Sequence, residues 1–174
     1  MNLKFIPLAL FLALAPAALA EFTVTLSNVH LCCSSCVKGV DKATATVGGA
    51  AAKSDRDADT VTITAPDKAT AQKAVDALVA AGYFGTPSDP AIKVDATTGA
   101  KDGMVESLTV TGVHLCCAKC VTAVDEALDK VSGVKANTAT KSAASFEVTG
   151  NFNPKDVFNA LQQAGLTGKV GNAQ

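Results

Sequence analysis

A nine-residue stretch occurs twice in this chain, and the repeat limits the fold more than any other feature of the sequence. The first copy covers residues 29–37 and the second covers 113–121, 84 positions later. All six cysteines and both histidines of the chain lie in these two copies. When the comparison is extended to 29–43 and 113–127, ten of fifteen positions are identical. The sequence therefore predicts two modules of one kind, each with its reactive side chains in a single loop.

The residues around the first copy predict a mixed α and β module. Val24 and Leu26 alternate with threonines before the loop, which is the period of a half-buried strand. Apolar residues at helical spacing follow the loop, and Gly48-Gly49 ends that helix. The predicted elements are a strand over 22–26, a helix from Cys36 to Val47, a hairpin over 50–64, a helix over 67–82 with Asp67 as its N-cap, and a last short strand near Ile92 and Val94.

The second copy is followed by the same order of elements. Leu108 and Val110 alternate as Val24 and Leu26 do, and a helix after the second cysteine loop ends at Ser132-Gly133. Asn153 is placed to cap the last helix because Pro154 follows it at the first helical position. Residues 95–104 between the modules are polar and contain Thr, Gly and Ala, which is typical of a short flexible linker.

This order, with Cys-x-x-Cys between the first strand and the first helix, resembles the heavy-metal-associated domain of copper chaperones, metal-pumping ATPases and periplasmic mercury-binding proteins. Cys33 and Cys36 match the family's ligand positions in the first module, and Cys117 and Cys120 match them in the second. Gly82-Tyr83 matches a Gly-Tyr motif late in the second helix. The second module has Gly165-Leu166 there.

The resemblance implies an α+β fold of two tandem ferredoxin-like βαββαβ sandwiches, each with a four-stranded antiparallel sheet and two helices. The expected boundaries are a signal peptide at 1–20, a first domain at 21–94, a linker at 95–104 and a second domain at 105–174.

Both loops depart from the family pattern. Leu31 and Leu115 replace the family's Met. The residues on either side of that position add further donors: His30, Cys32, His114 and Cys116. Adjacent cysteines on an extended backbone point to opposite faces, so Cys32 and Cys33 share an ion only where the chain turns sharply between them. Whether these four residues join the Cys-x-x-Cys thiolates is therefore left open by the sequence.

The donor set indicates a soft or borderline metal. Two thiolates suit copper(I), which is the expected ion, and mercury(II); a set of three cysteines and one histidine suits zinc. Cys36 and Cys120 fall in the first turn of a helix, where the helix dipole lowers a thiol's pKa. We expect one site per module, although a short linker favours a shared ion or transfer between sites. The expected partners are the metal ion and a metal transporter or an acceptor metalloprotein.

A thiol-disulfide redox protein that uses the same cysteines is the alternative, because it also places Cys-x-x-Cys at a helix N-terminus. The sequence lacks the Trp that precedes the pair in thioredoxins. No arrangement typical of a hydrolase or a phosphate-binding loop is present, so we expect a protein that is not an enzyme. A net charge of −1 argues against nucleic-acid binding.

Residues 1–20 have the pattern of a cleavable signal peptide. Lys4 precedes an apolar run, and Ala18-Leu19-Ala20 is a small-residue cleavage signal. We therefore expect cleavage after Ala20 and a periplasmic or secreted protein, without a membrane anchor once the peptide is removed.

Overall fold

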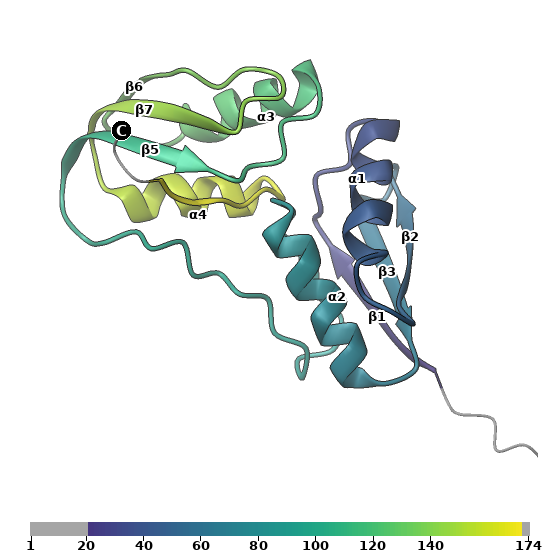
Figure 1. Ribbon diagram of the computed structural model, residues 1–174. Helices are drawn as coiled ribbons and strands as arrows, with labels where there is room; N and C mark the ends of the chain where they lie inside the picture. The colour runs from purple at the N-terminus through teal and green to yellow at the C-terminus, as the bar shows by residue number, and fades with distance from the viewer. Residues whose placement is uncertain (1–20, 172–174) are drawn as a thin grey trace, which may run out of the picture.

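The computed structural model describes residues 21–171. The predicted signal peptide at 1–20 lies outside the described residues. Within them the chain forms two four-stranded antiparallel sheets with two helices each, which confirms the predicted fold class (Figure 1). No helix among residues 21–171 is long and apolar enough to span a bilayer.

The first module has the order expected of a βαββαβ unit. Its sheet order is β2-β3-β1-β4, so β1 lies inside the sheet and pairs with both β3 and β4. Its elements are β1 (Phe22–Ser27), α1 (Ser34–Thr44), β2 (Ala51–Asp55), β3 (Thr60–Ala65), α2 (Lys68–Ala80) and β4 (Thr86–Pro87).

The second module repeats this topology with the sheet order β6-β7-β5-β8. Gly133 and Gly150 lie at a bulge between β6 and β7, where a Cβ on Gly133 would collide with the Asn151 carbonyl. Its elements are β5 (Val105–Thr111), α3 (Ala118–Leu128), β6 (Val134–Asn137), β7 (Ser145–Phe152), α4 (Pro154–Gln163) and β8 (Lys169–Val170).

The alternating residues of the strands form the cores. Val24, Leu26, Val61 and Ile63 are buried between the first sheet and its helices, while the threonines between them are partly exposed. The second core has larger side chains: Phe146, Val148, Phe152, Phe158 and Leu161. Burying a large apolar side chain contributes about 1.5–3 kcal/mol, so these residues account for much of the modules' stability.

Two helix caps follow the sequence pattern. The Asp67 carboxylate accepts the backbone N–H of Thr70 at 2.7 Å, and the Asn153 side chain accepts that of Lys155 at 3.0 Å. Pro154 is the first residue of α4, as predicted. Both N-cap predictions are confirmed.

The prediction of a strand near Ile92 and Val94 is wrong. The last strand of the first module is β4, which pairs with the end of β1. Ile92 is buried, but it lies in a turn. The Gln72 side chain accepts the Lys93 N–H at 2.8 Å and donates to the Lys93 carbonyl at 2.7 Å. These bonds to α2 occupy the backbone groups that a strand would need.

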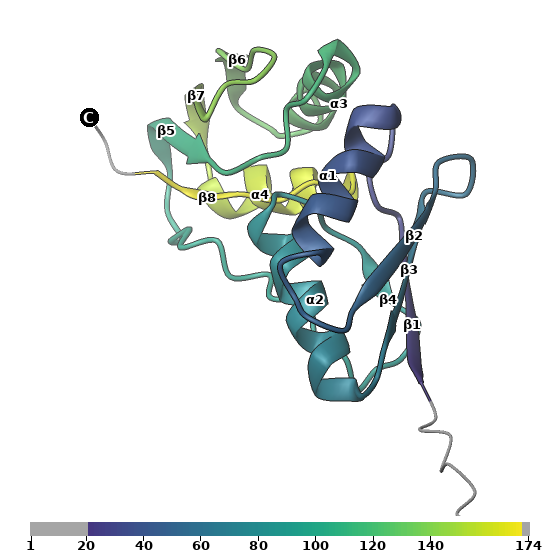
Figure 2. The same ribbon diagram turned by 45° about the vertical axis from the view of Figure 1, so that its right-hand side comes forward.

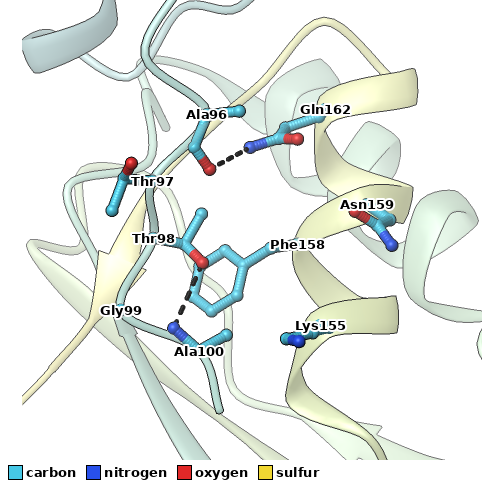
Figure 3. Close-up of a pocket in the computed structure, with 9 residues that line it drawn as sticks. All are labelled: Ala96, Thr97, Thr98, Gly99, Ala100, Lys155, Phe158, Asn159 and Gln162. Atoms are coloured by element: carbon cyan, nitrogen blue, oxygen red, sulfur yellow. Dashed lines mark hydrogen bonds between the residues drawn. The ribbon is translucent and has the colours of Figure 1, made fainter. Parts of the chain in front are cut away.

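The segment predicted as a flexible linker lies against the second module (Figure 3). Gln162 on α4 donates to the Ala96 carbonyl at 3.2 Å, and Val170 donates to the Thr98 carbonyl at 2.8 Å. Farther along, Lys155 forms an ion pair with Asp102. These contacts tie residues 96–102 to α4 and β8.

Candidate metal centre

Each cysteine loop is fixed between a buried leucine and a helix. Leu31 is buried beneath the first loop, where the sequence places it, and Leu115 is buried beneath the second. Cys33 and Cys117 are the N-cap residues of α1 and α3. Each helix therefore begins beside its Cys-x-x-Cys pair, with free N–H groups at that end.

The two modules meet near the C-terminal ends of α2 and α4 (Figure 1). The glycines that follow these helices, Gly82 and Gly165, contact the opposite module. Phe84 donates to the Gly165 carbonyl at 3.1 Å, and Thr167 donates to the Gly82 carbonyl at 3.0 Å. Tyr83 and Leu166 form an antiparallel bridge between these bonds. The equivalent segments of the repeats thus pair with each other, which gives the interface an approximate twofold symmetry.

The same glycines contact the loops of the opposite module. A Cβ on Gly82 would lie 2.5 Å from the backbone nitrogen of His114, and a Cβ on Gly165 would lie 2.5 Å from the backbone nitrogen of His30. His30 also donates its backbone N–H to the Gly165 carbonyl at 3.2 Å. Only glycine allows this approach, so the two residues set the distance between the modules.

This docking brings all six sulfur atoms together. Across the interface, Cys32 Sγ lies 3.4 Å from Cys117 Sγ and 3.6 Å from Cys120 Sγ. The symmetric contacts join Cys116 to Cys33 at 3.7 Å and to Cys36 at 3.5 Å. Cys36 and Cys120 lie 3.9 Å apart. The loops therefore form one cluster of thiols instead of the separate sites expected from the sequence. Figure 2 shows the backbones of the two modules side by side.

Within each module the extra cysteine contacts the Cys-x-x-Cys pair. Cys32 Sγ lies 3.6 Å from Cys36 Sγ, and Cys116 Sγ lies 3.7 Å from Cys120 Sγ. The strand alternation assumed from the sequence does not extend to the loop, because β1 ends at Ser27 and Asn28 has a positive φ of 57°. Adjacent cysteines can therefore face one site.

Among residues 21–171, four groups of three side chains have their donor atoms within 4.8 Å of one another. The structure thus brings seven of the eight predicted site residues into groups that fit a metal ion. The groups are His30, Cys32 and Cys120; Cys32, Cys33 and Cys117; Cys33, Cys36 and Cys116; and Cys116, Cys117 and Cys120.

The two histidines have different surroundings. His30 joins Cys32 and Cys120, and its Nε2 is buried without a hydrogen-bond partner. His114 is in none of the four groups found among the described residues. Its ring stacks on Tyr83 with a centroid distance of 4.4 Å, and its Nε2 lies 3.0 Å from the Tyr83 hydroxyl.

The Tyr83 hydroxyl determines which nitrogen of His114 carries a proton. It donates its single hydrogen to the Cys36 carbonyl at 2.7 Å, so His114 Nε2 must donate to the hydroxyl oxygen. Burial lowers the pKa of His114, which favours a neutral ring. Tyr83 was predicted only as part of the family's Gly-Tyr motif, without a role at the site. Its position in that motif and its being the single tyrosine of the chain are the sequence signals that could have indicated one.

Electrostatics divide the thiols into two kinds. A hydrogen bond between Cys36 and Cys120 raises the pKa of Cys36 and lowers that of Cys120. Burial raises the pKa of Cys116 to about 12. Burial also opposes ionisation of Cys33, but the Cys36 N–H and the Cys116 thiol lower its pKa to about 6. Coordination of metal by all six cysteines must therefore displace protons from the thiols whose pKa is raised.

No family model and no curated protein matches the chain. Among solved structures, the chain is similar to the solution structure of the N-terminal soluble domains of Bacillus subtilis CopA, with 16% sequence identity and a TM-score of 0.33. The match covers 89% of this chain and 97% of that chain.

Proposed function

We propose that this chain is an exported, non-enzymatic protein that binds copper(I) through its cysteine loops and carries or buffers the ion. Zinc and mercury(II) are the alternative ions. The observation that supports metal binding is the contact of six free cysteines in one cluster. Thiolates are soft ligands, and copper(I) is a soft ion that accepts two or three of them.

The exposure of the sulfurs supports a carrier. Cys36 and Cys120 are buried, while Cys32, Cys33, Cys116 and Cys117 are partly exposed. A second protein with thiol ligands can reach the exposed cysteines and take the ion by ligand exchange. We propose a metal transporter or an acceptor metalloprotein as that partner, in the periplasm or outside the cell.

Anaerobic titration of the reduced protein with copper(I), against a chelator of known affinity, tests this proposal. We expect stoichiometric uptake that is retained on a desalting column. The variant Cys33→Ser with Cys117→Ser should lose most of it. Ser35→Ala, an exposed change in the same loop, is the matched control and should bind as the parent does. Uptake of no copper, zinc or mercury by the reduced parent would contradict the proposal.

A redox role for the same cysteines is distinguished by its activity. Sulfur atoms 3.4 Å apart need to move little to form a disulfide, so oxidation of the metal-free protein is expected. A thiol-disulfide oxidoreductase would reduce insulin catalytically, whereas a metal carrier would not. Catalytic reduction of insulin by the metal-free protein would favour the redox function over ours.

A further inference from the structure

We propose that the six cysteines of both modules form one polynuclear copper(I)-thiolate site that holds up to four ions. This inference rests on the proposed function. It replaces one ion in each Cys-x-x-Cys loop by one cluster of ions that both loops share. Within the cluster, thiolates bridge neighbouring ions.

The overlap of the donor groups indicates bridging. Four groups of three donors are present, yet they use only six sulfurs and one imidazole. Five of the six cysteines belong to two groups each, and Cys36 belongs to one. Filling all four groups therefore requires thiolates that bind two ions at once, as soft sulfur ligands can.

The sulfur spacing indicates coordination by three donors. With a metal-sulfur bond of about 2.3 Å, a linear pair of thiolates lies about 4.6 Å apart and a trigonal set about 4.0 Å apart. The sulfurs in contact here lie between 3.4 Å and 3.9 Å apart, much nearer the trigonal value. Two separate linear sites would require the loops to open.

The charge of the thiolates is compatible with several ions. Six thiolates would carry a formal charge of about −6, and burying that charge without compensation is costly. Thiols that bind no ion keep their protons, so all six lose them only when ions occupy the whole cluster. Filling the four groups with copper(I) would leave a formal charge of about −2.

Cys32 and Cys116 decide between a cluster and two separate sites. Each of the four donor groups contains one of these two residues. Replacing both leaves each Cys-x-x-Cys pair in place, because Cys33, Cys36, Cys117 and Cys120 are unchanged. The double variant Cys32→Ser with Cys116→Ser thus removes the proposed cluster and keeps the simpler sites.

The test counts copper ions by native mass spectrometry of the reduced full chain during anaerobic titration. We expect the parent to pass from metal-free to the four-ion species with little of the intermediate species. The Cys32→Ser, Cys116→Ser variant should stop at two ions, bound one after the other. Ser35→Ala serves as the control, and circular dichroism checks that the variants are folded.

Three outcomes would contradict the cluster. If the parent saturates at one or two ions, the cluster is wrong and the proposed copper-binding function survives. If the double variant still takes up four ions, Cys32 and Cys116 are not the bridging residues and the proposed arrangement of the cluster is wrong. If the parent binds no copper, both the cluster and the proposed function are wrong.

Discussion

His30 and His114 occupy the same position in the two repeats, yet their neighbours give them different chemistry. Tyr83 faces His114 and hydrogen-bonds its Nε2, whereas Leu166 stands at the matching position of the other module and offers no hydrogen bond. His30 Nε2 is consequently buried without a partner, near Cys32 and Cys120. A buried imidazole nitrogen without a partner beside two thiols is suited to bind a metal.

We predict that His30→Ala weakens copper(I) binding at least about tenfold, because it removes a donor from one ligand group. His114→Ala should leave the affinity within a few-fold of the parent and mainly reduce stability. Competition against a copper(I) chelator measures both effects. Equal losses of affinity in the two variants would show that the histidines have the same role.

Tyr83→Phe tests the hydrogen bonds that hold the first loop. The substitution leaves the Cys36 carbonyl and His114 Nε2 without their partner, which we expect to lower the free energy of unfolding by about 1–3 kcal/mol. Chemical denaturation of the metal-free, reduced protein measures it. Leu166→Met at the equivalent position keeps volume and has no hydrogen bond to lose, so its cost should stay below about 1.5 kcal/mol. A larger loss for Leu166→Met would contradict this account of Tyr83.

The candidate donor residues could be selected from the sequence because all cysteines and histidines lie in one repeated motif. The difference between the two histidines could not be predicted from the sequence, because it depends on Tyr83, which is 31 residues away from His114 in the chain. Sequence spacing also left Cys32 undecided. Its orientation depends on where β1 ends, and Asn28 sets that end through a positive φ.

The glycines after α2 and α4 control how the modules dock. Gly82 and Gly165 have φ of 87° and 75°, which L side chains rarely adopt. A Cβ on either would lie within 2.6 Å of the opposite module's backbone. The residues that end these helices are therefore the same residues that bring the cysteine loops together.

We predict that Gly82→Ala and Gly165→Ala each destabilise the docked arrangement, at a cost of about 1–3 kcal/mol for the backbone strain alone. Combining them should separate the modules and lower the copper count to that of isolated Cys-x-x-Cys sites. Small-angle X-ray scattering and copper titration measure these effects.

Gly48→Ala is the matched control for the docking glycines. Its Cβ would meet nothing within 4 Å, so its scattering profile and copper count should equal those of the parent. If the double glycine variant keeps the compact profile and the parent's copper count, the glycines do not set the docking.

Helix caps and strand alternation were predictable because they depend on residues within a few positions of one another. Asp67 and Asn153 cap α2 and α4 as the sequence indicates. The strand near Ile92 was wrong because a side chain on α2, Gln72, binds the backbone of Lys93. Local apolar pattern does not reveal a competing hydrogen bond of this kind.

The two modules share one interface and one cluster of cysteines. The interface is made largely of backbone groups, such as the Phe84 N–H and the Gly165 carbonyl. Backbone groups leave little signal in a sequence. The fold of each module was therefore predictable from the repeat. For the contact between the modules, the sequence offered only the expectation that a short linker favours a shared ion or transfer between the sites.

We predict that copper(I) stabilises both modules together, because three of the four donor groups contain residues from both loops. At a free copper concentration one hundred times the dissociation constant, each ion bound at an independent site would add about 2.7 kcal/mol to the free energy of unfolding. Hydrogen exchange should show added protection in α1 and α3 alike. Protection confined to one module would contradict a shared site, and Cys33→Ser with Cys117→Ser should show little added protection in either module.

X-ray absorption at the copper edge of the fully loaded chain distinguishes one shared cluster from two separate sites. If the six thiolates hold neighbouring ions in one site, the spectrum will show three-coordinate copper(I) with sulfur ligands and a copper-copper scattering contribution, and that contribution will disappear in Cys32→Ser with Cys116→Ser. A spectrum of two-coordinate copper without copper-copper scattering in the parent would contradict the account.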